Sequence, residues 1–317
     1  MIRLFPAFAT IALIACSLLA HAQDYPNKPI RLVVGFPPGS TGDISARVVG
    51  GKVASILGQP VVVENRPGAA SSIAAAHVAR APKDGYTLFL GSNANVFNAA
   101  SNQPLEFDFY KDFAPVSLTT SVTTVLVVTP QTGIKSVAEL VSYARANPDK
   151  LNFGGVGTPP FVLELFNAAA GTRISYVPYQ GSPQVVTDLL GNRLHGYISP
   201  SSTVAGQIAS GHLVALAVTD AQRSPFFPNL PTMQEAGVPG CVASYWFGIL
   251  APAGTPRDIV EKLSKAVNEA GKANDIVESL RNQSIMVMTS SPEQFAQHIE
   301  NDRKLWTGVA EKARFKR

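Results

Sequence analysis

Cysteine is almost absent from this chain of 317 residues, which contains only Cys16 and Cys241. Cys16 lies in the apolar N-terminal stretch, and removal of that stretch would leave Cys241 without a disulfide partner. Structural zinc sites are built from several thiolates, usually with histidines placed close to them. The composition is therefore compatible with an oxidising compartment, although the mature chain would form no disulfide. It excludes a metal site built from cysteine.

Histidines and catalytic motifs are also scarce. None of the five histidines belongs to a His-Glu-x-x-His motif or another close metal-binding pair, and there is no Gly-x-Ser-x-Gly nucleophile elbow. The glycine-rich segment 154–160 is not followed by Lys-Ser or Lys-Thr, which excludes a P-loop. We therefore expect no catalytic residue, no cofactor and no metal. An enzyme on a similar scaffold stays an alternative, because fold alone does not fix function. The histidines are His21, His77, His195, His212 and His298.

Charged residues are few, at 15% of the chain, and the formal net charge is only +4. No stripe of basic residues interleaves with aromatic ones, so the usual footprint of a nucleic-acid-binding protein is missing. The small positive balance is compatible with an anionic small molecule. We therefore expect no nucleic-acid partner.

Only one long hydrophobic run is present, between Leu4 and Ala20, directly after the positive charge of Arg3. It ends in Ala20-His21-Ala22, which places small residues at the two positions that signal peptidase reads. These features predict a signal peptide over residues 1–22 and a periplasmic mature protein. The alternative is a lipoprotein box at Leu13-Ile14-Ala15-Cys16, in which Cys16 would be acylated and retained.

Short β-branched runs alternate with helical patterns in the rest of the chain, as is typical of α/β proteins with parallel sheets. The mature chain exceeds the ~250 residues at which a single core usually stops growing, so two domains are expected. A 3.6-residue apolar period predicts a helix over 41–57, and a capping box at Ser291 and Gln294 predicts the start of the last helix. The predicted strands cover 30–36, 61–64, 86–90, 125–129, 151–154, 174–178, 214–218 and 247–250.

Three loops after predicted strands carry binding chemistry, because ligands of open α/β sheets bind beyond the carboxyl ends of the strands. The loop 35–43 combines prolines and glycines with small hydroxyl residues and opens a helix, whose first-turn amides and positive dipole suit a carboxylate. Ser92 and Asn93 follow the next such strand, and 154–160 is a glycine-rich loop before a helix. The alternatives are an ordinary turn in which Asp43 stabilises the helix start, and simple helix capping by Ser92 and Asn93.

A series of motifs in a fixed order resembles the Bug family, the extracytoplasmic receptors of tripartite tricarboxylate transporters. The first two are PVVVENRPGA at 60–69 and KDGYTL at 83–88. The similarity extends from about Tyr25 to the C-terminus, and such an ordered series is far more specific than any single glycine loop. The other matching segments are YKDFAPV at 110–116, VPYQGS at 177–182, ALAVT at 215–219, PTMQEAG at 231–237, WFG at 246–248 and APAGTP at 251–256.

The resemblance implies a two-lobed α/β periplasmic-binding-protein fold (Venus-flytrap, type 2) with the ligand cleft between the lobes. The first lobe would comprise 24–124 and 249–317 and the second 125–248, with crossover strands near 125–129 and 245–250. It implies a receptor, not an enzyme, that captures a small organic carboxylate and delivers it to the membrane permease subunits of such a transporter. A receptor that feeds a signalling partner is the alternative, and we expect a monomer in either case. The ligand-binding residues carried over by matching position are Pro38, Gly39, Ser40, Thr41, Ser92, Asn93, Gly157, Thr158 and Tyr179.

The sequence departs from the family pattern in two places. His195 and Ser199 stand where the family usually has two aspartates, and Pro160 and Phe161 replace a loop serine and histidine. A cleft aspartate can hold a ligand ammonium group, so its loss argues against an amino-acid ligand, and a more apolar cleft favours an aromatic or longer aliphatic acid. We therefore place Ser199 in the ligand site and favour a dicarboxylate or an aromatic carboxylate. Neutral drift of the sequence is the alternative explanation.

Overall fold

The computed structural model describes residues 25–100, 104–156 and 161–313. The predicted signal peptide with Cys16, and the predicted site residues Gly157 and Thr158, lie outside the described residues. No helix in the described ranges is long and apolar enough to cross a membrane. Cys241 is free and fully buried, and this burial raises the pKa of its thiol to about 12.

Lobe 1 is built around a six-stranded mixed sheet with the order β11-β4-β10-β3-β1-β2. The strand β1 is parallel to β2 and β3, whereas β10 is antiparallel to β3 and β4. Its strands are β1 (Ile30–Val34), β2 (Val61–Asn65), β3 (Thr87–Ser92), β4 (Phe113–Val122), β10 (Tyr245–Pro252) and β11 (Ile285–Val287). Its helices are α2 (Thr41–Leu57), α3 (Ser72–Ala79), α4 (Asn93–Ala100), α9 (Arg257–Ala270), α10 (Asn274–Arg281) and α11 (Pro292–Ala313).

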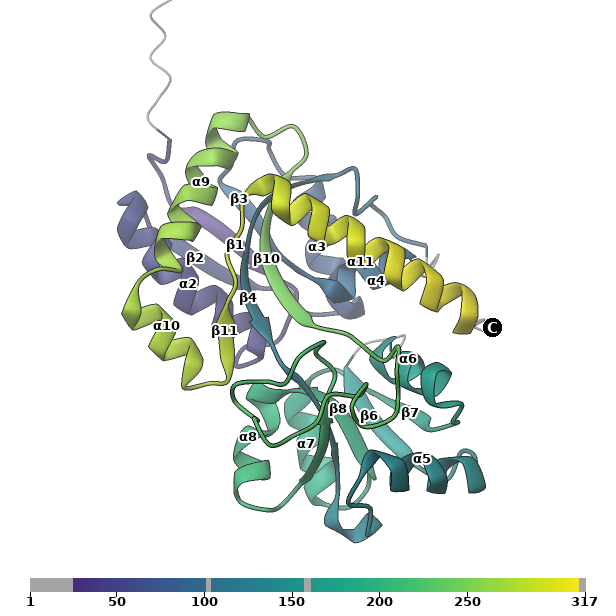
Figure 1. The fold of residues 1–317 in the computed structure, drawn as a ribbon. Helices are drawn as coiled ribbons and strands as arrows, with labels where there is room; N and C mark the ends of the chain where they lie inside the picture. The colour runs from purple at the N-terminus through teal and green to yellow at the C-terminus, as the bar shows by residue number, and fades with distance from the viewer. Residues whose placement is uncertain (1–24, 101–103, 157–160, 314–317) are drawn as a thin grey trace, which may run out of the picture.

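Lobe 2 is built around a five-stranded sheet with the order β7-β6-β8-β5-β9, and Figure 1 shows it below the sheet of lobe 1. The strand β6 is parallel to β7 and β8, and β5 is antiparallel to β8 and β9. Its strands are β5 (Thr124–Val128), β6 (Asn152–Val156), β7 (Ser175–Tyr179), β8 (Gly196–Pro200) and β9 (Val214–Val218). Its helices are α5 (Val137–Ala146), α6 (Phe161–Ala170), α7 (Ser182–Leu190) and α8 (Ser201–Ala209). This two-lobed α/β architecture is the one that the sequence predicted.

The chain crosses between the lobes where β4 continues into β5, with only Thr123 between the two strands. The hydroxyl of Thr123 lies 2.8 Å from that of Ser224, in the segment that leads from β9 back to lobe 1. The returning strand β10 already pairs with β4 at Tyr245, before the predicted lobe boundary at residue 249. The two crossings therefore lie side by side and are joined by hydrogen bonds.

The strand β4, second from the edge of its sheet, was not predicted, because its sequence is polar although its residues are mostly buried. Ser117, Thr119 and Thr120 are at most 1% exposed. Their hydroxyls compensate for the burial by bonding to Ser290 O at 2.9 Å, to Phe247 O at 3.0 Å and to Ser45 Oγ at 3.0 Å. A hydropathy pattern cannot reveal such a strand, since its burial depends on acceptors that lie far away in the sequence. The strands β8 and β11 were missed as well.

Asp220 lies beside the crossing between the lobes, and its protonation is expected to affect stability. Burial raises the pKa of its carboxyl to about 6, although a hydrogen bond with Thr123 acts in the opposite direction. A carboxyl whose pKa is raised on folding loses stability as the pH rises from about 4 through 6, because the folded state holds the proton more tightly. We therefore expect Asp220→Asn to raise the free energy of unfolding by about 2 kcal/mol at pH 7.5.

Urea unfolding at pH 7.5 and at pH 4.5 tests this expectation. The gain should shrink towards zero at the lower pH, where the wild-type carboxyl is protonated in the folded state. The exposed Asp258 provides the control, because its replacement by asparagine should change the free energy of unfolding by about 0.5 kcal/mol or less. An equal gain from Asp220→Asn at both pH values would show that the protonation of Asp220 is not the cause.

Candidate functional site

A cavity of about 110 Å³ lies between the two lobes and receives residues from both. Lobe 1 contributes the loop after β1, the first turn of α2 and the start of β10. Lobe 2 contributes β6, β8 and the first turns of α6 and α7. The described lining residues include no Asp, Glu, Lys, Arg or His. Seven of them are aromatic, namely Phe36, Phe153, Phe161, Tyr176, Tyr197, Tyr245 and Phe247.

Helix N-termini from both lobes meet at this cavity. Ser40, Thr41 and Gly42 of α2 line it, together with Ser182 at the start of α7 and Pro200 at the start of α8. The first amides of a helix lack partners within the helix, and this end carries the positive pole of the helix dipole. The cavity can therefore stabilise an anion without any cationic side chain.

Direct contacts hold these helix starts together across the cleft. The hydroxyls of Thr41 and Ser202 are 2.7 Å apart, which joins the first turns of α2 and α8. A methyl group placed on Gly181 would lie 3.5 Å from the ring of Pro37, so the start of α7 approaches the loop after β1. A methyl group on Gly42 would lie 2.8 Å from the ring of Phe36, and glycine is therefore required there for close packing. The starts of α2, α7 and α8 therefore lie close together at the cavity.

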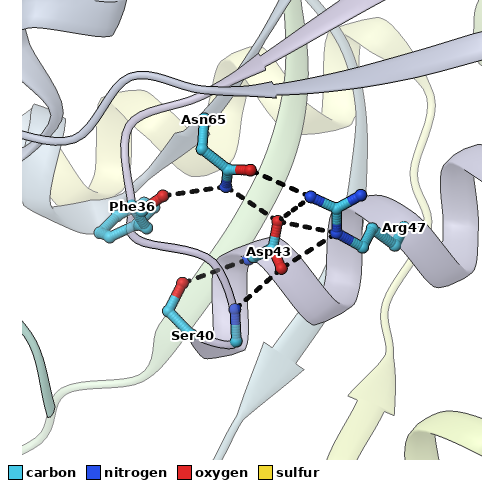
Figure 2. A network of polar contacts seen from close by, with 6 residues as sticks. Phe36, Ser40, Asp43, Arg47 and Asn65 are labelled. Atoms are coloured by element: carbon cyan, nitrogen blue, oxygen red, sulfur yellow. Dashed lines mark hydrogen bonds and ion pairs between the residues drawn. The ribbon is translucent and has the colours of Figure 1, made fainter. Parts of the chain in front are cut away.

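Asp43 fixes the loop that leads into α2. Its carboxylate accepts hydrogen bonds from the Gly39 amide at 2.9 Å, from the Arg47 guanidinium at 3.0 Å and from Asn65 Nδ2 at 2.8 Å, as Figure 2 shows in part. The Ser40 hydroxyl caps the helix by accepting from the Asp43 amide at 3.4 Å. Burial acts to raise the pKa of Asp43, but these hydrogen bonds and the charge of Arg47 together lower it. The carboxylate is therefore ionised and committed to the loop, which is the structural role that the sequence suggested for it.

Three tyrosines that the sequence did not single out have their rings at the cavity. They are Tyr176 of β7, Tyr197 of β8 and Tyr245 of β10, and burial raises the pKa of each hydroxyl. The Tyr197 hydroxyl lies 3.1 Å from Ser182 Oγ, and it also interacts with Ser199, whereas Tyr245 interacts with Ser92. Protonated phenols can donate hydrogen bonds, so the cavity gains neutral donors beside the helix starts.

The predicted residues of the loop after β1 fall into two groups. Ser40 and Thr41 line the cavity, whereas Pro38 and Gly39 are exposed and do not. The Gly39 amide is instead occupied by Asp43. The end of the loop that enters α2 therefore lies at the cavity, whereas the proline turn lies outside the cavity and supports that end.

The remaining predicted residues do not line the cavity themselves. Ser92 is buried beside Tyr245, and Asn93 donates to the carbonyl of Ser244 at 3.1 Å. Ser199 is fully buried, with its hydroxyl 2.6 Å from that of Thr203. Tyr179 donates to Asp188 and borders an adjoining groove. Ser92 and Ser199 thus each lie behind a tyrosine of the cavity. Tyr197 stands two residues before Ser199 in β8, and side chains two residues apart in a strand point to the same face of the sheet. This alternation was the sequence signal that could have revealed Tyr197.

A larger groove of about 1050 Å³ adjoins the cavity and shares Phe36, Pro37, Ala70 and Val156 with it. Arg66, His77, Arg80 and Glu106 border this groove. Both guanidinium groups are paired, Arg66 with Glu64 and Arg80 with Glu106. Burial and the charge of Arg66 lower the pKa of His77, so that its imidazole is neutral near pH 7. The described residues contain no group of three or more His, Cys, Asp or Glu side chains placed to bind a metal.

Comparisons with known proteins agree on one class. The profile of the family described as "Tripartite tricarboxylate transporter family receptor" matches residues 45–314. Protein BugT of Bordetella pertussis is 37% identical over 91% of this chain and 90% of its own length. A solved protein of R. palustris with adipate is 35% identical, covers 92% of this chain and 98% of its own, and superimposes with a TM-score of 0.85. MatC of Rhodopseudomonas palustris, solved with bound malate, is 29% identical over 90% of this chain and all of its own, with a TM-score of 0.84.

Proposed function

Since the chain belongs to the tripartite tricarboxylate transporter receptor family, a family of periplasmic solute-binding proteins, we propose that it captures a small organic carboxylate between its lobes. The observation that carries this proposal is the meeting of helix N-termini from both lobes at a cavity whose described lining residues carry no charged side chain. Such a site favours a carboxylate over a cation or a neutral sugar, because only an anion gains from the helix dipoles. The bound adipate and malate of two similar structures support the same ligand class.

The proposed carboxylate site uses the first turn of α2, with Ser40, Thr41 and the amide of Gly42. Ser182, Tyr197 and Tyr245 add donors from around the same place. Pro38, Gly39, Ser92 and Asn93 shape and support this site, and Ser199 positions Tyr197. The family resemblance adds further parts to this proposal. It implies that the ligand also contacts Gly157, Thr158 and Tyr179, and that the receptor is a periplasmic monomer whose partners are the permease subunits.

The proposal predicts that a small carboxylate stabilises the mature chain. A ligand that binds only the folded state raises the free energy of unfolding by about 2.7 kcal/mol at a concentration 100-fold above Kd. A thermal-shift screen of mono- and dicarboxylates followed by calorimetry measures this stabilisation. Neutral sugars of similar size serve as controls and should have no effect.

The same preparation distinguishes a receptor from an enzyme. Chromatography after long incubation should recover the bound acid unchanged, because the cavity contains neither a nucleophile paired with a base nor a metal site among its described residues. Measurable conversion would contradict the receptor function. Stabilisation by sugars but not by carboxylates would contradict the proposed ligand class.

A further inference from the structure

The two tryptophans of the chain, Trp246 and Trp306, both act on one carboxyl group outside the cavity, that of Asp302. Trp246 of β10 donates its indole N–H to Asp302 Oδ2 at 2.7 Å. Trp306 lies one helical turn after Asp302 on α11 and helps to lower the pKa of the same carboxyl. Asp302 therefore connects the last helix to both indoles.

Each indole is in turn attached to the wall of the cavity. Side chains alternate along a strand, so Trp246 points away from the cavity while its neighbours Tyr245 and Phe247 line it. Trp306 has its ring 5.3 Å from that of Phe161 of α6, which is another lining residue. One carboxyl on α11 thus reaches the lobe 1 part of the wall through β10 and the lobe 2 part through α6.

His298 makes this connection sensitive to protonation. It precedes Asp302 by one helical turn, and its ring lies 5.4 Å from that of Trp246. Its buried Nε2 has no hydrogen-bond partner among the described residues. Burial lowers the pKa of His298 more than the nearby carboxyl raises it, and burial raises the pKa of Asp302. The imidazole is therefore neutral near pH 7, and acidification places a positive charge beside the bond between Trp246 and Asp302.

The other ionisable groups near α11 leave Asp302 and His298 as a pair. The helix α4 and the strands β4 and β10 carry no charged residue, and Glu164 of α6 has its pKa raised by burial alone. Burial raises the pKa of Tyr110 to about 12, so this phenol stays neutral. The remaining charges on or beside the helix form ion pairs with one another, namely Arg303 with Glu300, Arg257 of α9 with Glu293, and Lys111 with Asp108.

We propose, on the basis of the carboxylate-binding function above, that Asp302 is a positioning residue for the ligand, which fixes Trp246 and Trp306 behind the aromatic wall, and that protonation of His298 loosens this hold. A charged imidazole attracts the carboxylate away from the indole N–H, because the two side chains are one turn apart on the same helix. A buried charge is also costly, so it favours movement of α11 that lets water reach the imidazole. Affinity is thus set in part by a pair that does not line the cavity.

Fluorescence tests the pair directly, because the chain has no tryptophan other than Trp246 and Trp306. A protonated imidazole in contact with an indole quenches its emission. The emission of the mature chain should fall as the pH is lowered from 7.5 to 5, with a midpoint below the ordinary histidine value of 6.5. His298→Phe keeps an aromatic ring beside Trp246 and should abolish the fall. A fall that persists in this variant overturns the role of His298.

Calorimetry with adipate, malate and benzoate at pH 7.5 tests the effect on binding. Asp302→Leu removes the acceptor and should weaken the acids that bind at least tenfold, whereas Asp302→Asn keeps an oxygen for Trp246 and should weaken them less than threefold. Trp246→Phe removes the donor, so adding it to Asp302→Leu should cost less than a further threefold, as expected for two halves of one interaction. The control is Glu300→Gln on the same helix, whose partner is Arg303 and which should leave affinity unchanged.

The pH dependence separates positioning from a purely structural role. Between pH 7.5 and pH 5 the wild type should lose at least threefold in affinity relative to His298→Phe, and the protonation of the acid itself cancels in this ratio. Melting temperatures verify folding, and the ratio needs no variant of Asp302. A ratio that does not change with pH, or a folded Asp302→Leu that binds as the wild type does, overturns this inference and leaves the proposed function intact. Failure of every acid to bind the wild type overturns both.

Discussion

Replacing Asp43 with alanine is expected to lower the free energy of unfolding by about 2–3 kcal/mol and to weaken carboxylate binding at least tenfold. The carboxylate is only 4% exposed and accepts hydrogen bonds from Gly39, Arg47 and Asn65. Its loss removes the charge-assisted bonds that hold the loop before α2 and leaves the Gly39 amide without its partner. Ser40 and Thr41 would then no longer be fixed at the cavity.

The stabilisation by Asp43 should depend on pH in a defined direction. Its pKa is lowered in the folded state, so its contribution is present above the ordinary carboxyl pKa of about 4 and is lost as the pH falls below that value. Unfolding by urea at pH 7 and at pH 3.5 measures this loss. The destabilisation of Asp43→Ala should therefore be smaller at pH 3.5 than at pH 7.

Asp275→Ala is the matched control for Asp43→Ala. Asp275 also lies in the first turn of a helix and pairs with a base, Lys52, but its side chain is 65% exposed. Exposed ion pairs typically contribute about 0–1 kcal/mol, so this variant should bind the ligand normally. Equal effects of the two substitutions on affinity would contradict the role of Asp43 in fixing the loop.

Trp306→Ala is expected to lower the free energy of unfolding by about 3–5 kcal/mol, the range for deletion of a large buried aromatic side chain. Trp306 is 1% exposed and packs edge-to-face on Phe97 of α4 and on Phe161 of α6. It therefore joins α11 of lobe 1 to the start of α6 in lobe 2. Figure 1 shows the C-terminal half of α11 passing towards α6. Its loss should also release Phe161, which lines the cavity, and weaken the binding of the proposed carboxylate.

Leu305 provides the control on the same helix, because its side chain is 39% exposed. Leu305→Ala should change the free energy of unfolding by about 0.5 kcal/mol or less. Denaturant unfolding measures both variants, and calorimetry measures the affinity of each. If Trp306→Ala destabilised the chain but bound the carboxylate found in the thermal-shift screen as well as the wild type does, the contact with Phe161 would have no part in ligand binding.

Local patterns in the sequence determined the elements whose residues repeat at short spacing. The apolar period over 41–57 predicted α2 with its observed bounds, and the strand predicted at 214–218 is β9. The capping box is confirmed as well, since the Ser291 amide donates to Gln294 Oε1 at 2.9 Å and the Gln294 amide donates to Ser291 Oγ at 3.1 Å. These elements could be predicted because the interactions that define them lie within a few residues.

The family and the importance of the loop before α2 were also evident from the sequence. Ordered motifs identified the receptor class, and the small residues after β1 placed Ser40 and Thr41 at the cavity. The same reasoning pointed to Ser92 and Ser199, which in the structure are buried beside Tyr245 and Tyr197. It did not single out these two tyrosines, whose side chains line the cavity.

Only the tertiary structure decided which groups line the cavity. Tyr197 and Tyr245 come from different sheets, and neither carries a local motif, so their meeting depends on the crossing at Thr123 and the return of β10. The burial of β4 likewise depends on acceptors such as Ser290 and Phe247 that are distant in the chain. The sequence by itself determined the receptor class and its implied two-lobed fold through ordered motifs, and the starts of α2 and α11 through local periodicity and capping. The aromatic lining of the cavity was decided by long-range packing, because burial and side-chain direction are set by residues that touch only after both lobes have formed.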